Sequence, residues 1–167
     1  VFGDPPRWSK VEWGGVDILI LDSTSVDDRL QTAFILYSLR GSRPTIVVFH
    51  HPAFSCSKHG STLDVREGWV PLFESDDEVL LVLSGHDHNY QRFRLRDIEY
   101  VVTGGGGRRL YQLVECSAEH PTRQVGNVAH HFLRLTQSAG TLSLQAIGID
   151  GLPFDSLIVD LDQGLEP

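Results

Sequence analysis

Methionine is absent from this sequence of 167 residues, and cysteine is limited to two positions. The chain starts at Val1, and together with the missing methionine this leads us to expect an upstream portion of a longer protein. Two cysteines, Cys56 and Cys116, do not make a disulfide-rich scaffold; a disulfide and free thiols are both open to them. Their number therefore does not identify the compartment.

Basic residues are scarce as well, since 14 Lys and Arg stand against 22 Asp and Glu, giving a formal net charge of -8. Binding to a nucleic acid backbone or to an anionic membrane surface requires clustered positive charge, so we expect neither. No apolar run approaches the ~18–20 residues that a membrane-spanning helix needs. The composition, with 41% hydrophobic and 22% charged residues, is that of a globular protein, and we expect one domain over residues 1–167.

The first half of the chain predicts a strand–helix–strand unit. Residues 8–13 and 16–21 predict two strands joined by a tight Gly14-Gly15 hairpin. A helix is predicted over residues 28–40, capped by Ser25 or Asp27. We expect its core-facing stripe to contain Leu30, Phe34 and Tyr37, and a parallel strand to follow at residues 45–49.

The second half predicts further strands and a change of sheet type. A turn is expected near Gly3-Asp4, a long polar loop at residues 51–67 and a short helix at 69–73. Strands are predicted at residues 78–84, 92–96, 98–103, 110–114, 130–135, 141–149 and 156–161, with a glycine turn at 104–107. The fold class is therefore α/β, a mixed sheet with flanking helices and an antiparallel C-terminal part.

Histidines follow two of the predicted buried strands at the point where each strand ends. His50 and His51 follow one strand, and His86 and His88 follow the other. Ligands in open α/β sheets bind at the carboxyl ends of strands, and neutral imidazole binds zinc, iron, copper or nickel. If residues 86–88 are extended, both histidines share one face and Asp87 turns away. The alternative is that strand-end histidines are structural, which we expect for His120, His130 and His131.

The histidine segments also resemble a known family. The chain reads VFHHP at residues 48–52 and GHDHNYQR at 85–92, with supporting matches in LDS at 21–23, the helix over 31–39, YVVTGGGG at 100–107 and residues 150–156. These motifs, in this order, are similar to those of calcineurin-like metallophosphoesterases, and more closely to the purple acid phosphatase branch. The resemblance implies the C-terminal half of the catalytic domain, within a four-layer α/β/β/α sandwich.

The resemblance further implies the roles of individual residues at a two-metal site. His50 and His86 would bind one metal ion and His88 the other, with His51 a neighbour and not a ligand. His59, Asn89 and Tyr90 would bind the substrate. The metals would be Fe, Zn or Mn, and the reaction would be hydrolysis of phosphate mono- or diesters by metal-bound hydroxide. An extracytoplasmic location is favoured by the resemblance alone.

The family's acidic metal-binding motifs are missing from this sequence. Its Gly-Asp and Gly-Asn-His motifs have no counterpart, and Asp22 ends a strand at a position where the family has no ligand. We therefore expect a missing N-terminal half, or a partner chain, to complete the site and to cover an apolar surface. Two alternatives remain: a catalytically incompetent half-domain or binding module, and a mononuclear zinc protein that uses His50, His86 and His88.

Overall fold

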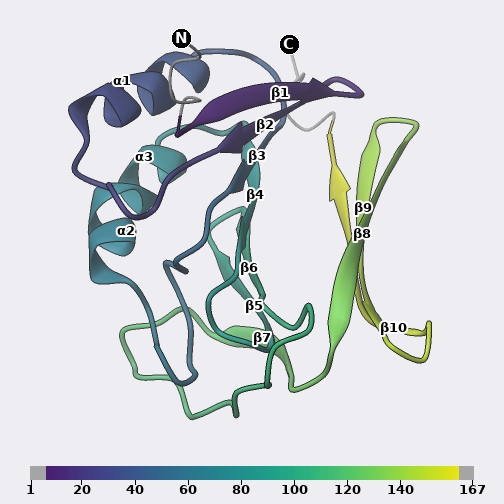
Figure 1. The fold of residues 1–167 in the computed structure, drawn as a ribbon. Helices are drawn as coiled ribbons and strands as arrows, with labels where there is room; N and C mark the ends of the chain where they lie inside the picture. The colour runs from purple at the N-terminus through teal and green to yellow at the C-terminus, as the bar shows by residue number, and fades with distance from the viewer. Residues whose placement is uncertain (1–6, 162–167) are drawn as a thin grey trace, which may run out of the picture.

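The computed structural model describes residues 7–161, and the turn expected at Gly3-Asp4 lies outside them. In this part of the chain the elements form three layers (Figure 1). Helices cover one face of a large mixed sheet, and a small antiparallel sheet packs against the other face. The predicted α/β class, with a mixed sheet, flanking helices and an antiparallel C-terminal part, is confirmed.

The large sheet contains seven of the strands in residues 7–161, in the order β1-β2-β3-β4-β6-β5-β7. Its strands are β1 (Ser9–Trp13), β2 (Val16–Ile20), β3 (Thr45–Val48), β4 (Val79–Ser84), β5 (Tyr90–Leu95), β6 (Ile98–Thr103) and β7 (Arg123–Asn127). Strands β2, β3, β4 and β6 run parallel, because helical or long connections separate them in sequence. The β1–β2 hairpin is antiparallel, and both residues of its Gly14-Gly15 turn have positive φ, as expected.

Three helices cover one face of this sheet within the described residues: α1 (Arg29–Ser38), α2 (Leu63–Gly68) and α3 (Val70–Glu74). The core on this side joins Ile35 of α1 and Phe73 of α3 to Val47 and Val82 of the central strands. Parallel strands covered on both faces read as continuous apolar runs, which explains why β3 and β4 were predictable from sequence. No helix in residues 7–161 is long and apolar enough to cross a membrane.

The small sheet has the order β10-β9-β8 and contains β8 (His131–Ser138), β9 (Thr141–Gly148) and β10 (Pro153–Asp160). Leu142, Leu144 and Ala146 of β9 are fully buried against the large sheet, where they meet Ile46 and Leu81. Because side chains alternate between the two faces of a strand, these three residues of β9 lie on the same face and form one apolar layer.

A buried polar cluster links the two sheets. Asp155 of β10 accepts hydrogen bonds from the Tyr90 hydroxyl at 2.6 Å and from Arg92 Nε at 2.7 Å, both on β5. Arg92 also contacts Glu99 of β6 at 3.2 Å. Burial raises the pKa of Tyr90. Burial also acts to raise the pKa of Asp155, but the hydrogen bonds from Arg92 and Tyr90 together with the charge of Arg92 lower it. The cluster fixes the position of the small sheet through charge-assisted hydrogen bonds.

Four local expectations are corrected. Helix α1 is capped by the side chain of Asp28, not by Ser25 or Asp27. Leu30 and Tyr37 are each 74% exposed, and the buried face of α1 contains Gln31, Ile35 and Ser38. Helix α2 shortens the loop expected at 51–67. Residues 110–114 form no strand, while β7 was not predicted.

Candidate metal centre

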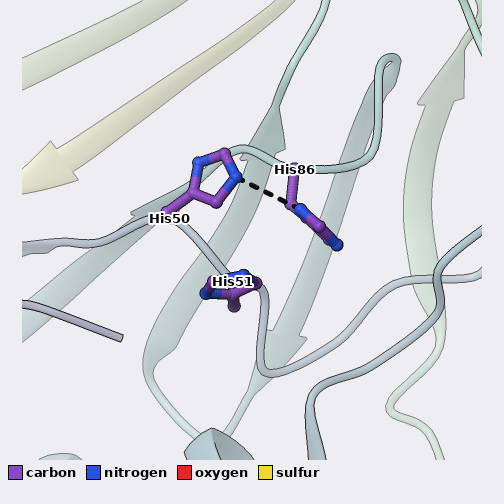
Figure 2. Close-up of side chains that lie close together, drawn as sticks. All are labelled: His50, His51 and His86. Atoms are coloured by element: carbon purple, nitrogen blue, oxygen red, sulfur yellow. Dashed lines mark hydrogen bonds between the residues drawn. The ribbon is translucent and has the colours of Figure 1, made fainter. Parts of the chain in front are cut away.

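The candidate site lies at the carboxyl ends of two neighbouring parallel strands. β3 ends at Val48, so His50 and His51 leave the sheet beside His86, which follows β4. The two loops are joined by a hydrogen bond from the Gly85 amide to the His50 carbonyl at 3.0 Å. Figure 2 shows the side chains of His50, His51 and His86 gathered at this edge. The position is the one that α/β sheets use for ligands.

The spacing of the ring nitrogens fits a metal ion. His50 Nε2 lies 3.1 Å from His86 Nδ1 (Figure 2). Two imidazoles at ~2.0–2.1 Å from one cation, at tetrahedral or octahedral angles, place their nitrogens about 2.9–3.4 Å apart. A nitrogen of His51 also lies within 4.8 Å of ligating nitrogens of the other two, which makes these three histidines a possible metal-binding group. No carboxylate belongs to this group in the described part of the chain.

The protonation of the two paired histidines suits metal binding. Partial burial lowers the pKa of His50, and the neighbouring His51 and His88 lower it further. Burial and then His51, His59 and His50 lower the pKa of His86, against a smaller opposing effect of Asp87. A depressed pKa keeps imidazole neutral near pH 7, and a metal ion binds only the neutral ring.

His88 lies apart from the group of three. The segment is not regularly extended, because His86 has φ of 65°, and His88 is not part of the group formed by His50, His51 and His86. His88 stacks on Tyr111 with ring centroids 4.2 Å apart, and its Nδ1 faces the Arg109 carbonyl at 2.9 Å. A carbonyl only accepts, so Nδ1 carries the proton and Nε2 keeps its lone pair, as in histidines that bind metals. The assignment of His88 to a second metal remains a prediction.

Asp87 turns into the protein and organises the loop opposite. Its carboxylate is fully buried and accepts from the Ser55 hydroxyl at 2.6 Å and from the amides of His59 and Gly60 at 3.0 and 3.2 Å. His59 is thereby held with its ring centroid 4.4 Å from that of His86. Its exposed ring borders the site, and the contact with a substrate that the family resemblance implies remains a prediction.

Asn89 and Tyr90, also expected to bind substrate, are fully buried. Asn89 donates to the Ser57 hydroxyl at 2.7 Å, and Tyr90 donates to Asp155. Their polar atoms make hydrogen bonds within the fold, and a contact of either residue with a substrate remains a prediction.

Glycine is required where the turn after β6 passes beneath the histidine loop. A Cβ atom at Gly104 would lie 2.1 Å from the Asp87 carbonyl oxygen, and one at Gly105 would lie 2.3 Å from His131 Nδ1. Neither contact can be relieved by rotating a surface side chain. The glycine turn at 104–107 therefore lets the backbone approach the site closely.

Cys56 and Cys116 form a disulfide across a sequence separation of 60 residues, with Cα atoms 5.1 Å apart. The pairing resolves the question that the sequence left open, and neither cysteine is a free thiol. The bond joins the loop that carries His59 to the segment that contains Tyr111, so it braces both sides of the site.

No functional role was predicted from the sequence for Ser23, Gln31 or Tyr111. Ser23, which follows β2, contacts the His51 ring, and Gln31 of α1 hydrogen-bonds the backbone beside it; a polar residue at a strand end is the signal that marks Ser23. Asp22, not expected to be a ligand, accepts hydrogen bonds from Thr24, which lower its pKa.

Comparison with known proteins supports the resemblance over part of the chain. No protein-family profile matches. Purple acid phosphatase 3 of Arabidopsis thaliana is 26% identical over 105 residues, which are 62% of this chain and 28% of that protein. Purple acid phosphatase 4 of the same plant is 35% identical over 65 residues, 38% of this chain and 19% of that protein. The chain thus spans less than a third of the length of these curated relatives.

Solved structures share the fold at low identity. Purple acid phosphatase PPD1 from yellow lupin (Lupinus luteus) seeds superposes with a TM-score of 0.73 at 21% identity, covering 92% of this chain and 32% of that one. GAP50, the anchor in the inner membrane complex of Plasmodium, gives 0.76 at 13% identity, covering 92% and 53%. PhoD gives 0.59 at 12% identity, covering 92% and 40%.

The layered sheets and the strand-end histidines define a chain of the metallophosphoesterase fold. Its sequence relatives are hydrolases, purple acid phosphatases by name. The predicted resemblance to the purple acid phosphatase branch is thereby confirmed over the aligned parts.

Proposed function

We propose that this chain supplies the histidine side of a metal-dependent phosphoesterase, which hydrolyses phosphate mono- or diesters. The observation that carries the proposal is the 3.1 Å approach of His50 Nε2 to His86 Nδ1 at the ends of β3 and β4. It gains support from the aligned purple acid phosphatases, whose name states a hydrolase activity. His50 and His86 would hold one cation and His88 the other, as the resemblance implies.

Iron, zinc or manganese bound here would lower the pKa of a water ligand and polarise a phosphate oxygen. The chain's own residues would bind the metal ions and orient the substrate. His88 presents the lone pair of Nε2, because its Nδ1–H donates a hydrogen bond to the Arg109 carbonyl. Exposed His59 borders His86 and is available to donate to a phosphate oxygen. The ammonium of Lys58, 4.5 Å from the centroid of the Tyr111 ring, adds positive charge at the same edge.

The acidic ligands of the proposed site come from outside the described residues. Two cations need negatively charged ligands, which three or four neutral imidazoles do not provide. We propose that an N-terminal half of the same protein, or a partner chain, completes the centre. The disulfide supports an extracytoplasmic location, because such bonds persist in oxidising compartments.

Metal retention tests the proposal. The purified chain, loaded with zinc, iron or manganese and desalted, should retain metal through His50 and His86. His86→Ala should lose the metal. His120→Gln should retain it, because the His120 ring hydrogen-bonds to Ser61 and Ser117 and not to the candidate site. Equal metal content in His86→Ala and the parent chain would contradict the assignment. Turnover is then measured with mono- and diester substrates on the protein that includes any upstream half.

A second candidate function is a binding module without turnover. It is favoured by the absence of a carboxylate from the histidine group in residues 7–161, and GAP50 shows that a protein described as an anchor has this fold. Robust hydrolysis by the 167-residue chain alone would exclude it. A single tightly held zinc per chain would favour the mononuclear alternative with His50, His86 and His88.

A further inference from the structure

The hydroxyl of Ser23 makes three hydrogen bonds to residues of the candidate metal centre. Ser23 follows β2 and is only 7% exposed. The backbone amides of His50 and His51 donate to its Oγ at 3.2 and 2.9 Å. The same Oγ lies 2.9 Å from Nδ1 of the His51 ring. One serine side chain thus contacts the backbone of a predicted metal ligand and the ring of its neighbour.

Counting donors and acceptors decides the direction of the last hydrogen bond. A hydroxyl has two lone pairs and one proton. The two amides occupy both lone pairs, so the proton of Ser23 remains for His51 Nδ1. If His51 donated instead, the hydroxyl would face three donors and its own proton would have no acceptor. Nδ1 of His51 is therefore the acceptor, and in the neutral ring the proton resides on Nε2.

Gln31 holds Ser23 in place from helix α1. Its side chain is fully buried; Oε1 accepts from the Asp22 amide at 2.7 Å, and Nε2 donates to the carbonyls of Asp22 and Ser25 at 3.1 and 2.9 Å. These bonds fix the backbone on both sides of Ser23. Because the buried Gln31 amide makes three hydrogen bonds to this backbone, it restrains the position of Ser23.

His51 and His88 are therefore set in opposite tautomers. At His88 the partner of Nδ1 is a carbonyl, so Nε2 keeps a lone pair for a metal. At His51 the lone pair of Nδ1 is used by Ser23, and Nε2 carries a hydrogen. No hydrogen bond joins Nε2 of His51 to another described residue, and the ring is only partly buried. This N–H is available beside His50 and His86, whose ring centroids lie 4.9 and 4.7 Å away.

We propose that Ser23 fixes His51 in the Nε2–H tautomer, which makes His51 a hydrogen-bond donor to a bound phosphate oxygen and not a metal ligand. Ser23 is then a positioning residue, and Gln31 supports it. The phosphate contact rests on the proposed function, whereas the tautomer does not. The proximity of His50, His51 and His86 alone would suggest three metal ligands. The hydrogen bond between Ser23 and His51 Nδ1 leaves His50 and His86 as the two ligands of this group.

The tautomer is tested on the metal-free chain by long-range ¹H–¹⁵N correlation at about pH 8, above the ordinary histidine pKa of about 6.5. We expect an unprotonated Nδ1 and a protonated Nε2 for His51. Ser23→Thr keeps the hydroxyl and should keep this pattern, whereas Ser23→Ala should mix the two tautomers. A protonated Nδ1 in the parent chain overturns the proposal, and that result needs no variant to fold.

Metal and phosphate binding form the second test. His51→Leu should bind zinc within about twofold of the parent chain, whereas His50→Ala should lose most of its affinity. Inorganic phosphate should bind the zinc-loaded His51→Leu variant roughly tenfold more weakly, the effect of one hydrogen bond to a charged group. Loss of zinc from His51→Leu equal to that of His50→Ala overturns the proposal, as does unchanged phosphate affinity. If the parent chain binds no zinc, the proposed function fails, and the tautomer still decides this inference.

Discussion

Removal of the disulfide should cost this chain a large share of its stability. Cys56 and Cys116 are 60 positions apart in the sequence, and the segment between them includes His59, His86 and His88. For a loop of this length, the chain-entropy relation gives a loss of about 14 cal/mol/K in the unfolded state, or about 4 kcal/mol at 25 °C. Domains are stable by about 5–15 kcal/mol, so the double variant Cys56→Ala/Cys116→Ala should unfold far more readily.

Urea unfolding at equilibrium measures the effect. We expect the midpoint to fall with little change in slope, and the melting temperature to drop by roughly 10 °C for a chain of this size. Alanine is suitable because Cys56 is buried and serine would bury a hydroxyl. Reductant should reproduce the loss in the parent chain and leave the double variant unchanged. A loss below about 1 kcal/mol would refute the reasoning.

Two further predictions concern the packing around the site. Asp155→Asn should destabilise the chain by roughly 3 kcal/mol, the low end for a broken buried ion pair, because Glu99 still contacts Arg92. Because the pKa of folded Asp155 is lowered, the stability that Asp155 contributes is fully present above the ordinary Asp pKa and is lost as the pH falls through the folded-state pKa. Denaturant unfolding measures this contribution, and a stability difference between parent and variant that is the same at pH 7 and in strong acid would contradict it. Gly104→Ala should cost about 1–3 kcal/mol and shift the NMR signals of His86 and His88, because its Cβ collides with the Asp87 carbonyl. Gly106→Ala, where no atom lies within 4 Å of the added Cβ, is the matched control, and equal melting temperatures for the two variants would be the adverse result.

Local signals account for the parts of the fold that were predicted from sequence. β3 and β4 are apolar runs covered on both faces, and the histidines follow them directly. Parallel neighbours end at the same sheet edge, so the meeting of His50 and His86 follows from topology. The strand at 110–114 was wrong because Tyr111 and Val114 donate to loop carbonyls, of His88 and Cys56, and to no strand.

Tertiary contacts account for what could not be predicted. Helix α1 buries Gln31 and exposes Leu30, because the amide is needed to hold the chain at Asp22. Hydrophobic periodicity has no means of detecting such a contact. The left-handed backbone at His86 is likewise not visible in the spacing of the two histidines, which predicted an extended segment.

Zinc titration of the ¹⁵N-labelled chain, followed at each histidine ring, tests the central claim most directly. The account predicts that His50 Nε2 and His86 Nδ1 shift together as zinc binds, because they lie 3.1 Å apart and share the cation. The nitrogens of His51 should keep the pattern of the Nε2–H tautomer throughout. Zinc binding that leaves His50 and His86 unchanged, or no binding at millimolar zinc, would contradict the account.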